Sequence, residues 1–225
     1  MSTRLPSRAV AVLLVAVASA SCRAQAPETG VFITMIGADT VLVERFERTR
    51  DSVRGEIAVR APGQAAQESQ HLIYAAALAP QGLVSGVDLS VRIAGLVAQT
   101  AEVRLGLDSA GAHALFIQGA DTTRTATVQG AVPLINVSLA LLEQVVRRAR
   151  NIPGDSVTVP LLSLEGGETT QSTVTFDTHD GAELVTASER MRLRVDAAGR
   201  ILGGGDAARQ IRVERVPVLP AGWLP

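Results

Sequence analysis

Apolar and polar residues alternate along much of the chain. In the segment 53–59 small or apolar side chains occupy every second position, while Arg54, Glu56 and the following Arg60 lie on the other face. The same period of two recurs over 83–93, 103–108 and 191–195. A half-buried strand has this period, and strands with one solvated face are typical of antiparallel sheets.

Further segments combine apolar, β-branched and polar residues in a strand-like way. We expect additional strands at 31–36, 40–48, 71–78, 114–118, 123–128, 156–162, 172–177, 183–187 and 210–216. About a dozen twisted strands do not form a flat sheet. The pattern therefore predicts a mainly β fold with a large curved antiparallel sheet, arranged as a half-barrel, a barrel or a sandwich.

One segment departs from this alternation. Between 134 and 150 the apolar residues recur every three or four positions and cover a broad helical face. Pro133 suits a first helical position, Asn151 can end the helix, and Pro153 prevents its continuation. We predict one main helix at about 134–150, lying against or inside the sheet.

The first 26 residues have the layout of a secretory signal peptide. Arg4 and Arg8 precede an unbroken apolar run over 9–18, and small residues follow it. Ten apolar residues are too few to span a bilayer, which takes about 20. We expect export, to the periplasm or to the cell envelope. A single β-rich domain at 27–216 and a proline-rich tail at 217–225 would follow.

The chain has one cysteine, Cys22, directly after the apolar run. The segment 19–22 resembles a bacterial lipobox, in which the cysteine is acylated, although Ser19 stands where leucine is usual. Cys22 is therefore a candidate lipid anchor. Cleavage after Ala20 or Ala26 also fits the small-residue pattern.

Composition and charge exclude several classes of function. All 21 basic residues are arginine, so lysine-based Schiff-base chemistry and a P-loop are excluded. Without its leader the chain has 18 Arg against 22 acids, a net charge of −4. This charge and the 3% aromatic content argue against nucleic-acid binding. One cysteine excludes an internal disulfide. We expect no cofactor and no metal.

Two polar clusters are candidates for chemistry. Asp177, His179 and Asp180 could support a hydrolase, although their neighbours are turn-forming residues. Arg190, Arg192 and Arg194 share one strand face and are candidates for anion binding. Such a stripe also occurs on solvated faces paired with acids on the next strand. The sequence supports no catalytic assignment.

The leader, the lipobox-like segment, the many amphipathic strands and the apolar helix together resemble bacterial envelope lipoprotein carriers. In that family an open β-barrel holds a helix and encloses an apolar cavity. The segment 192–204 also resembles a hairpin of exported bacterial β-rich proteins of unknown function. These resemblances concern the pattern along the chain and transfer no functional residue.

Three functions follow as hypotheses. The first is a non-enzymatic module that binds a lipid or another apolar ligand. The second is a structural or interaction domain of an envelope assembly, reached through open sheet edges. The third is a hydrolase-type enzyme. A membrane would be contacted only through the Cys22 anchor. The apolar cavity of the first hypothesis would be lined by residues that could equally form an ordinary core: Val87, Leu89, Val91, Leu141 and Val145.

Overall fold

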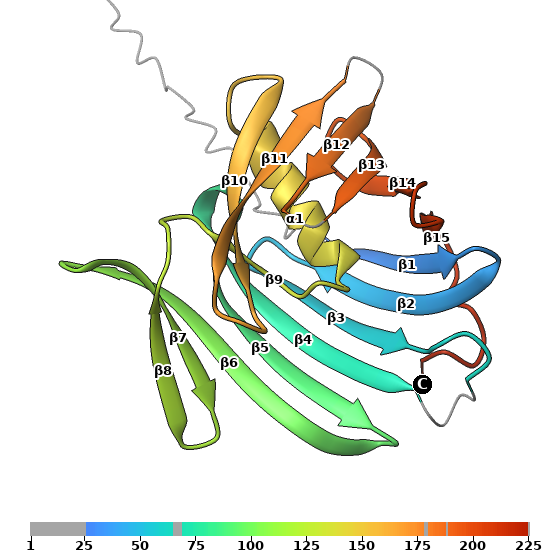
Figure 1. Cartoon of the computed structure of the whole chain (residues 1–225), viewed down its shortest axis with the longest axis horizontal. Coiled ribbons are helices and arrows are strands. Elements are labelled where there is room, and N and C mark those ends of the chain that lie inside the picture. Colours follow the sequence, from blue (N-terminus) through green and yellow to red (C-terminus); the bar gives the residue numbers. More distant parts are fainter. Residues whose placement is uncertain (1–25, 65–68, 178–179, 188, 225) are drawn as a thin grey trace, which may run out of the picture.

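The computed structural model describes residues 26–64, 69–177, 180–187 and 189–224. Fifteen strands form one sheet, in the order β8-β7-β6-β5-β4-β3-β2-β1-β15-β14-β13-β12-β11-β10-β9 (Figure 1). The strands are β1 (Glu28–Ile36), β2 (Asp39–Arg48), β3 (Ser52–Val59), β4 (Gln70–Ala79), β5 (Leu83–Ile93), β6 (Leu96–Asp108), β7 (Gly111–Gln118), β8 (Asp121–Ala126), β9 (Val132–Leu134), β10 (Ser156–Ser163), β11 (Thr169–Phe176), β12 (Gly181–Val185), β13 (Arg190–Val195), β14 (Ile201–Asp206) and β15 (Ile211–Val216).

The sheet curls into an open, barrel-like shape, which confirms the predicted mainly β class. Strands β8 and β9 are its two ends, and β9 comes back against β5 without hydrogen-bonding to it. The sheet is mixed, because β9 pairs with β10 in parallel while every other pair is antiparallel. Parallel neighbours need a crossover connection, and the one α-helix in the described part of the chain supplies it.

The helix α1 (Leu139–Arg150) begins five residues later than the sequence predicts. Leu134 ends β9, and Pro133 lies inside that strand. Ser138 has an extended backbone, and its Oγ accepts a hydrogen bond from Leu141 N at 3.2 Å. This hydroxyl is the N-cap that sets the start of the helix. The predicted end is correct, because Asn151 is the C-cap residue.

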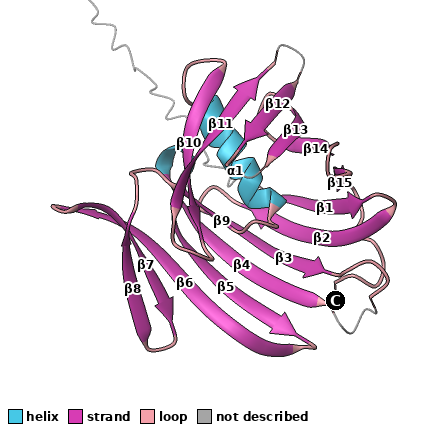
Figure 2. Ribbon diagram, viewed as in Figure 1, coloured by secondary structure: helices cyan, strands magenta, loops and turns pink. Residues whose placement is uncertain are grey.

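Helix α1 lies inside the curled sheet, between β1–β4 and β10–β13 (Figures 1 and 2). Nine of its residues are buried, including Glu143 and Gln144. Gln144 Nε2 donates to the carbonyl of Gly82, in the short 3₁₀ turn Pro80–Gly82, at 2.7 Å. The main hydrophobic core surrounds this helix, and a smaller cluster joins β6 and β7 to β10.

Glycine and aromatic residues alternate across four neighbouring strands on the face that meets the helix. The row runs Gly30, Phe46, Gly55 and Tyr74, and each residue pairs with the next. A Cβ atom at Gly30 would overlap the Phe46 ring, and one at Gly55 would overlap the Tyr74 ring. The two glycines therefore let both rings lie on the sheet, as aromatic side chains do over glycines in curved sheets.

Candidate functional site

An interior pocket of about 420 Å³ lies at the N-terminal end of α1, between the two parts of the sheet. Most of its wall is aliphatic, supplied by side chains such as Val59, Val137 and Met191. Hydroxyl and amide groups complete it, including Thr34 and Asn136. A concave, mainly apolar space with a few polar groups is the usual form of a small-molecule site, and the volume is within the common range of roughly 300–1,000 Å³.

A buried carboxylate closes the helix end beside this pocket. Glu44, on β2, has no solvent exposure. Its oxygens accept hydrogen bonds from the Ser138 hydroxyl at 2.7 Å and the Tyr74 hydroxyl at 2.6 Å. They also accept from the backbone N–H groups of Leu139 at 2.7 Å and Ala140 at 3.0 Å. The positive end of the helix dipole is thus occupied by the protein's own acid.

Burial is the largest influence on the pKa of Glu44. Desolvation raises the pKa of Glu44 above its usual value, although the hydrogen bonds from Tyr74, Ser138 and the two backbone amides act in the opposite direction. Burial also raises the pKa of Tyr74, and the neighbouring Glu44 charge raises it further. Tyr74 is therefore a neutral hydrogen-bond donor to Glu44.

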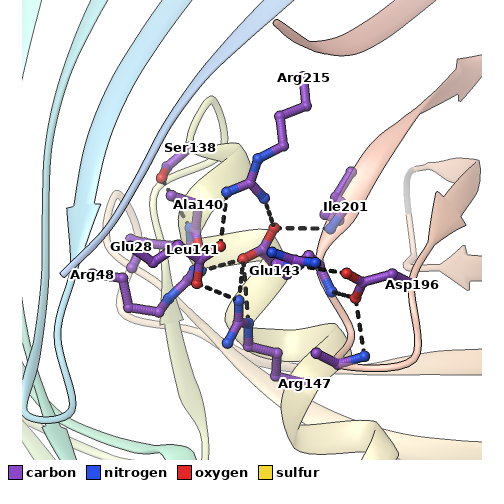
Figure 3. A network of polar contacts seen from close by, with 12 residues as sticks. Glu28, Arg48, Ser138, Ala140, Leu141, Glu143, Arg147, Asp196, Ile201 and Arg215 are labelled. Atoms are coloured by element: carbon purple, nitrogen blue, oxygen red, sulfur yellow. Dashed lines mark hydrogen bonds and ion pairs between the residues drawn. The ribbon is translucent and has the colours of Figure 1, made fainter. Parts of the chain in front are cut away.

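A second buried acid, Glu143, joins the middle of α1 to three strands (Figure 3). Its oxygens accept from Arg215 at 2.9 Å, from Arg147 at 3.0 Å, from Ile201 N at 2.8 Å and from Arg48. Arg48 Nη2 also donates to the carbonyl of Ala140 at 2.9 Å. Because these partners come from β2, β14, β15 and α1, one carboxylate links the helix to both parts of the sheet.

Glu28, at the start of β1, completes this ion network. It pairs with Arg147 at 2.7 Å, Arg215 at 2.8 Å and Arg48 at 3.4 Å. Burial acts to raise the pKa of Glu28, but the three arginines outweigh it and hold the pKa below the usual value. The network contains three arginines and two acids. Arg215 also lies over the rings of Phe32 and Phe46.

The five residues expected to line an apolar cavity lie elsewhere. Val87, Leu141 and Val145 are almost completely buried in the main core, and Leu89 and Val91 are partly buried against it. None of them lines the interior pocket, which is formed nearer the strand ends. The pattern located apolar faces correctly, but tight packing around α1 fills the middle of the barrel with side chains.

The predicted arginine stripe is on β13 and faces solvent. Arg190 and Arg192 pair with Glu183 of the neighbouring β12, at 3.4 Å and 3.5 Å. Their side chains are 65% and 85% exposed, so these contacts are weak surface pairs. The guanidinium of Arg194 lies over Gly203. The stripe thus has the acidic neighbour that a solvated face is expected to have.

Other candidates lie wholly or partly outside the described residues. Cys22 and the leader are outside them, as is His179. Asp177 Oδ1 accepts from Gly181 N at 2.8 Å and so closes a local turn. Within the described segments, no three His, Cys, Asp or Glu side chains gather in a way that could hold a metal ion. The same segments contain no helix with the length and hydrophobicity of a membrane span.

A larger open groove, of about 1390 Å³, crosses the other face of the sheet. Its side chains come from two rows of paired residues that run across the strands. Phe46 and Tyr74 belong to the row between these two, so their rings point to the opposite face, toward α1. Several of the groove's charges are paired with one another, for example Arg45 with Glu56 at 2.9 Å. We regard the interior pocket as the better small-molecule site because it is more enclosed and has far fewer charged residues in its wall.

The sequence gives little signal for the residues that build this centre. In β2 the inward positions are Leu42, Glu44, Phe46 and Arg48, so polar and apolar residues share one face. Glu143 is the one acid of α1, and most of the buried residues of this helix are apolar. Arg147 is explained equally well by its place in the last helical turn. A charged residue within an apolar face is the only signal that could have identified Glu143.

Comparisons with known proteins identify the type of fold but do not assign the chain to a family. No family model and no curated protein matches the chain. A DUF1089 family protein from Pseudomonas aeruginosa has a similar structure, with a TM-score of 0.56 and 12% identity over 74% of this chain and 90% of that one. A β-barrel-like protein of the domain of unknown function DUF1849 from Brucella abortus matches with a TM-score of 0.52 and 7% identity, covering 84% and 94%. This chain therefore has the β-barrel-like fold of bacterial proteins of unknown function.

Proposed function

We propose that the protein is a non-enzymatic binding module that holds a small apolar ligand in the interior pocket. The observation that carries this proposal is the 420 Å³ space beside the N-terminal end of α1, with its largely aliphatic wall. The pattern-level resemblance to envelope lipoprotein carriers supports an apolar ligand as well. The ligand class, its source and the cellular location are parts of the same proposal.

The charges around the pocket favour a neutral ligand. The backbone amides at the start of α1, which would attract an anion, already bind Glu44. Among the described residues, Glu189 is the one ionisable side chain that lines the pocket, and it pairs with Arg209 at 3.0 Å. A carboxylate ligand would lose its hydration without gaining a cationic partner inside the wall. An uncharged molecule, or one with a hydroxyl at its polar end, avoids this penalty.

We expect the neutral fluorophore N-phenyl-1-naphthylamine to bind the protein and to emit more strongly there. Met191→Trp should fill part of the pocket and weaken this binding by about tenfold or more. Leu107→Trp is the matched control, because Leu107 is 63% exposed and does not line this pocket. Fluorescence titration measures both variants. Equal affinities for the two would contradict the proposed site.

Decanol and decanoate have the same chain length and differ in charge at neutral pH. We expect decanol to displace the fluorophore at lower concentration than decanoate. Native mass spectrometry of protein purified from its own cells would then identify the natural ligand by mass. Preferential displacement by decanoate, or protein that carries no ligand, would count against a neutral apolar cargo.

We also propose that the chain is exported and acylated on Cys22. The expected result is a mature N-terminus at Cys22 that carries the mass of two or three acyl chains. Mass spectrometry of the intact protein and of its N-terminal peptide measures this directly, and Cys22→Ala should release the protein from the membrane fraction. A mature chain that starts elsewhere and has no added mass would refute the anchor but would leave the pocket unaffected.

A further inference from the structure

The β5–β6 turn exposes a cluster of aliphatic side chains at one end of the sheet. Leu96 is 76% exposed, Val97 56% and Ile93 52%. Ala94 and Gly95 form the two-residue turn between them, both with positive φ, and Ile93 pairs with Leu96 across it. Turn geometry constrains only the two central residues, Ala94 and Gly95, and does not call for large aliphatic side chains beside them. Local backbone geometry therefore does not explain these side chains.

This apolar turn also extends beyond part of the sheet. Strand β6 pairs with β7 only from Glu102 onward, so the segment 96–101 has β5 as its neighbour on one side alone. Residues 91–101 include one basic residue, the exposed Arg92, and no acid. The turn thus combines exposed aliphatic groups with a single positive charge at its base.

The turn lies at the same end of the molecule as the interior pocket. In the antiparallel sheet the end of β5 is on the side of the end of β1, the end of β3 and the start of β15. The pocket is lined by residues near those ends, Thr34, Val59 and Ile211. Figure 1 shows the β1–β2 and β5–β6 turns on one side of the molecule. Ile36, beside the β1–β2 turn, is 45% exposed as well.

We infer that the β5–β6 turn docks on a lipid bilayer and inserts Ile93, Leu96 and Val97 among the acyl chains. Removing aliphatic groups from water is favourable in proportion to the area buried, and a hydrocarbon layer accepts them without a shaped partner. Arg92 would reach the phosphate level of the lipid headgroups. A stable protein interface needs roughly 800 Å² on each partner, which one two-residue turn with three such side chains does not supply.

Docking in this way would turn the pocket end of the molecule toward the membrane. An apolar ligand could then move between bilayer and pocket with little exposure to water. The docking itself does not need a ligand, so it can be tested independently of the proposed function. It is also separate from acylation of Cys22, which precedes the whole of β1 in the sequence and is not part of this turn.

The test places the only tryptophan of the full chain at the turn. In a Trp223→Phe background, Leu96→Trp is compared with Leu107→Trp, which is also strongly exposed but lies at the opposite end of β6. Phosphatidylcholine vesicles should shift the Leu96→Trp emission to shorter wavelength, and brominated acyl chains should quench it. The Leu107→Trp emission should not change. Because the signal comes from the turn itself, binding through the leader or an acyl anchor does not produce it.

A second variant measures how much the other two side chains contribute. Adding Ile93→Ser and Val97→Ser to the Leu96→Trp chain should raise the vesicle concentration at half-maximal shift by about tenfold or more. An unchanged Leu96→Trp emission, or equal responses at both ends of β6, overturns the inference. A shift that appears without vesicles and grows with protein concentration also overturns it, because the turn would then contact a second copy of the chain.

Discussion

Replacing Glu143 with methionine should lower the free energy of unfolding by roughly 3–5 kcal/mol. The carboxylate is fully buried and accepts from three arginines and one backbone amide. Without it, Arg48 and Arg215 remain largely buried, with Glu28 as the only acid of the network. Removing one partner of a buried ion network costs this much because the remaining charges lose their compensation and cannot return to water.

Urea unfolding at pH 7 measures this loss, and Glu183→Met is the matched control. Glu183 also pairs with two arginines, but those arginines are well exposed, so its replacement should cost about 1 kcal/mol or less. Arg215→Met should be less damaging in the Glu143→Met chain than in the original chain, since it then removes an uncompensated charge. If Glu143→Met lowered the free energy of unfolding as little as the control, the prediction would fail, because only screening by water could make the loss of a buried ion network so small.

Glu44→Leu should cost about 4 kcal/mol. The change leaves four buried donors without an acceptor: two hydroxyls, of Tyr74 and Ser138, and two backbone amides at the start of α1. Each buried donor left unpaired costs about 1–3 kcal/mol, and the helix also loses a favourable negative charge at its N-terminus. Glu47→Leu, an exposed position on the same strand, should change stability by less than about 0.5 kcal/mol.

The pH dependence of the free energy of unfolding distinguishes the contribution of the Glu44 charge from that of its hydrogen bonds. Because the folded-state pKa of Glu44 is raised above 4.5, the native state takes up a proton before the unfolded state as the pH falls. This group therefore adds stability as the pH decreases from neutral toward about 4.5. Glu44→Gln lacks that titration, so its deficit relative to the original chain should grow over the same range. A deficit that shrinks with acidification would contradict the raised pKa.

Strand positions could be predicted from the sequence because one-sided burial produces a period of two. The segments 83–93 and 53–59 agree with β5 and β3 to within one residue. Two strands lack that signal. Strand β9 has only three residues, and β14 contains Gly203–Gly205, which have no side chains to alternate. The helix start was wrong because Leu134 and Ile135 continue the apolar spacing, while the cap at Ser138 depends on a small polar residue within that run.

The candidate site could not be predicted in the same way, because no short segment contains it. The pocket takes residues from strands as distant in sequence as β1 and β15, together with the start of α1. Glu44 and Arg48 lie on the inward face of β2 because they bond to Ser138 and Glu143, which are about 95 residues away in the sequence. Local pattern describes each strand, whereas the site depends on which strands curl around the helix.

The place of β15 in the sheet has a consequence for how the chain acquires its fold. The last strand in sequence lies between β1 and β14, near the middle of the sheet, and it supplies Arg215 to the ion network. Strands β1–β8 and β9–β14 are each connected through neighbouring pairs, but only β15 joins them. During synthesis the two groups of strands cannot join into one sheet before β15 has been made. Assembly of a single sheet around the helix therefore waits for β15, and a chain truncated before Ile211 would leave two half-sheets with one shared core exposed.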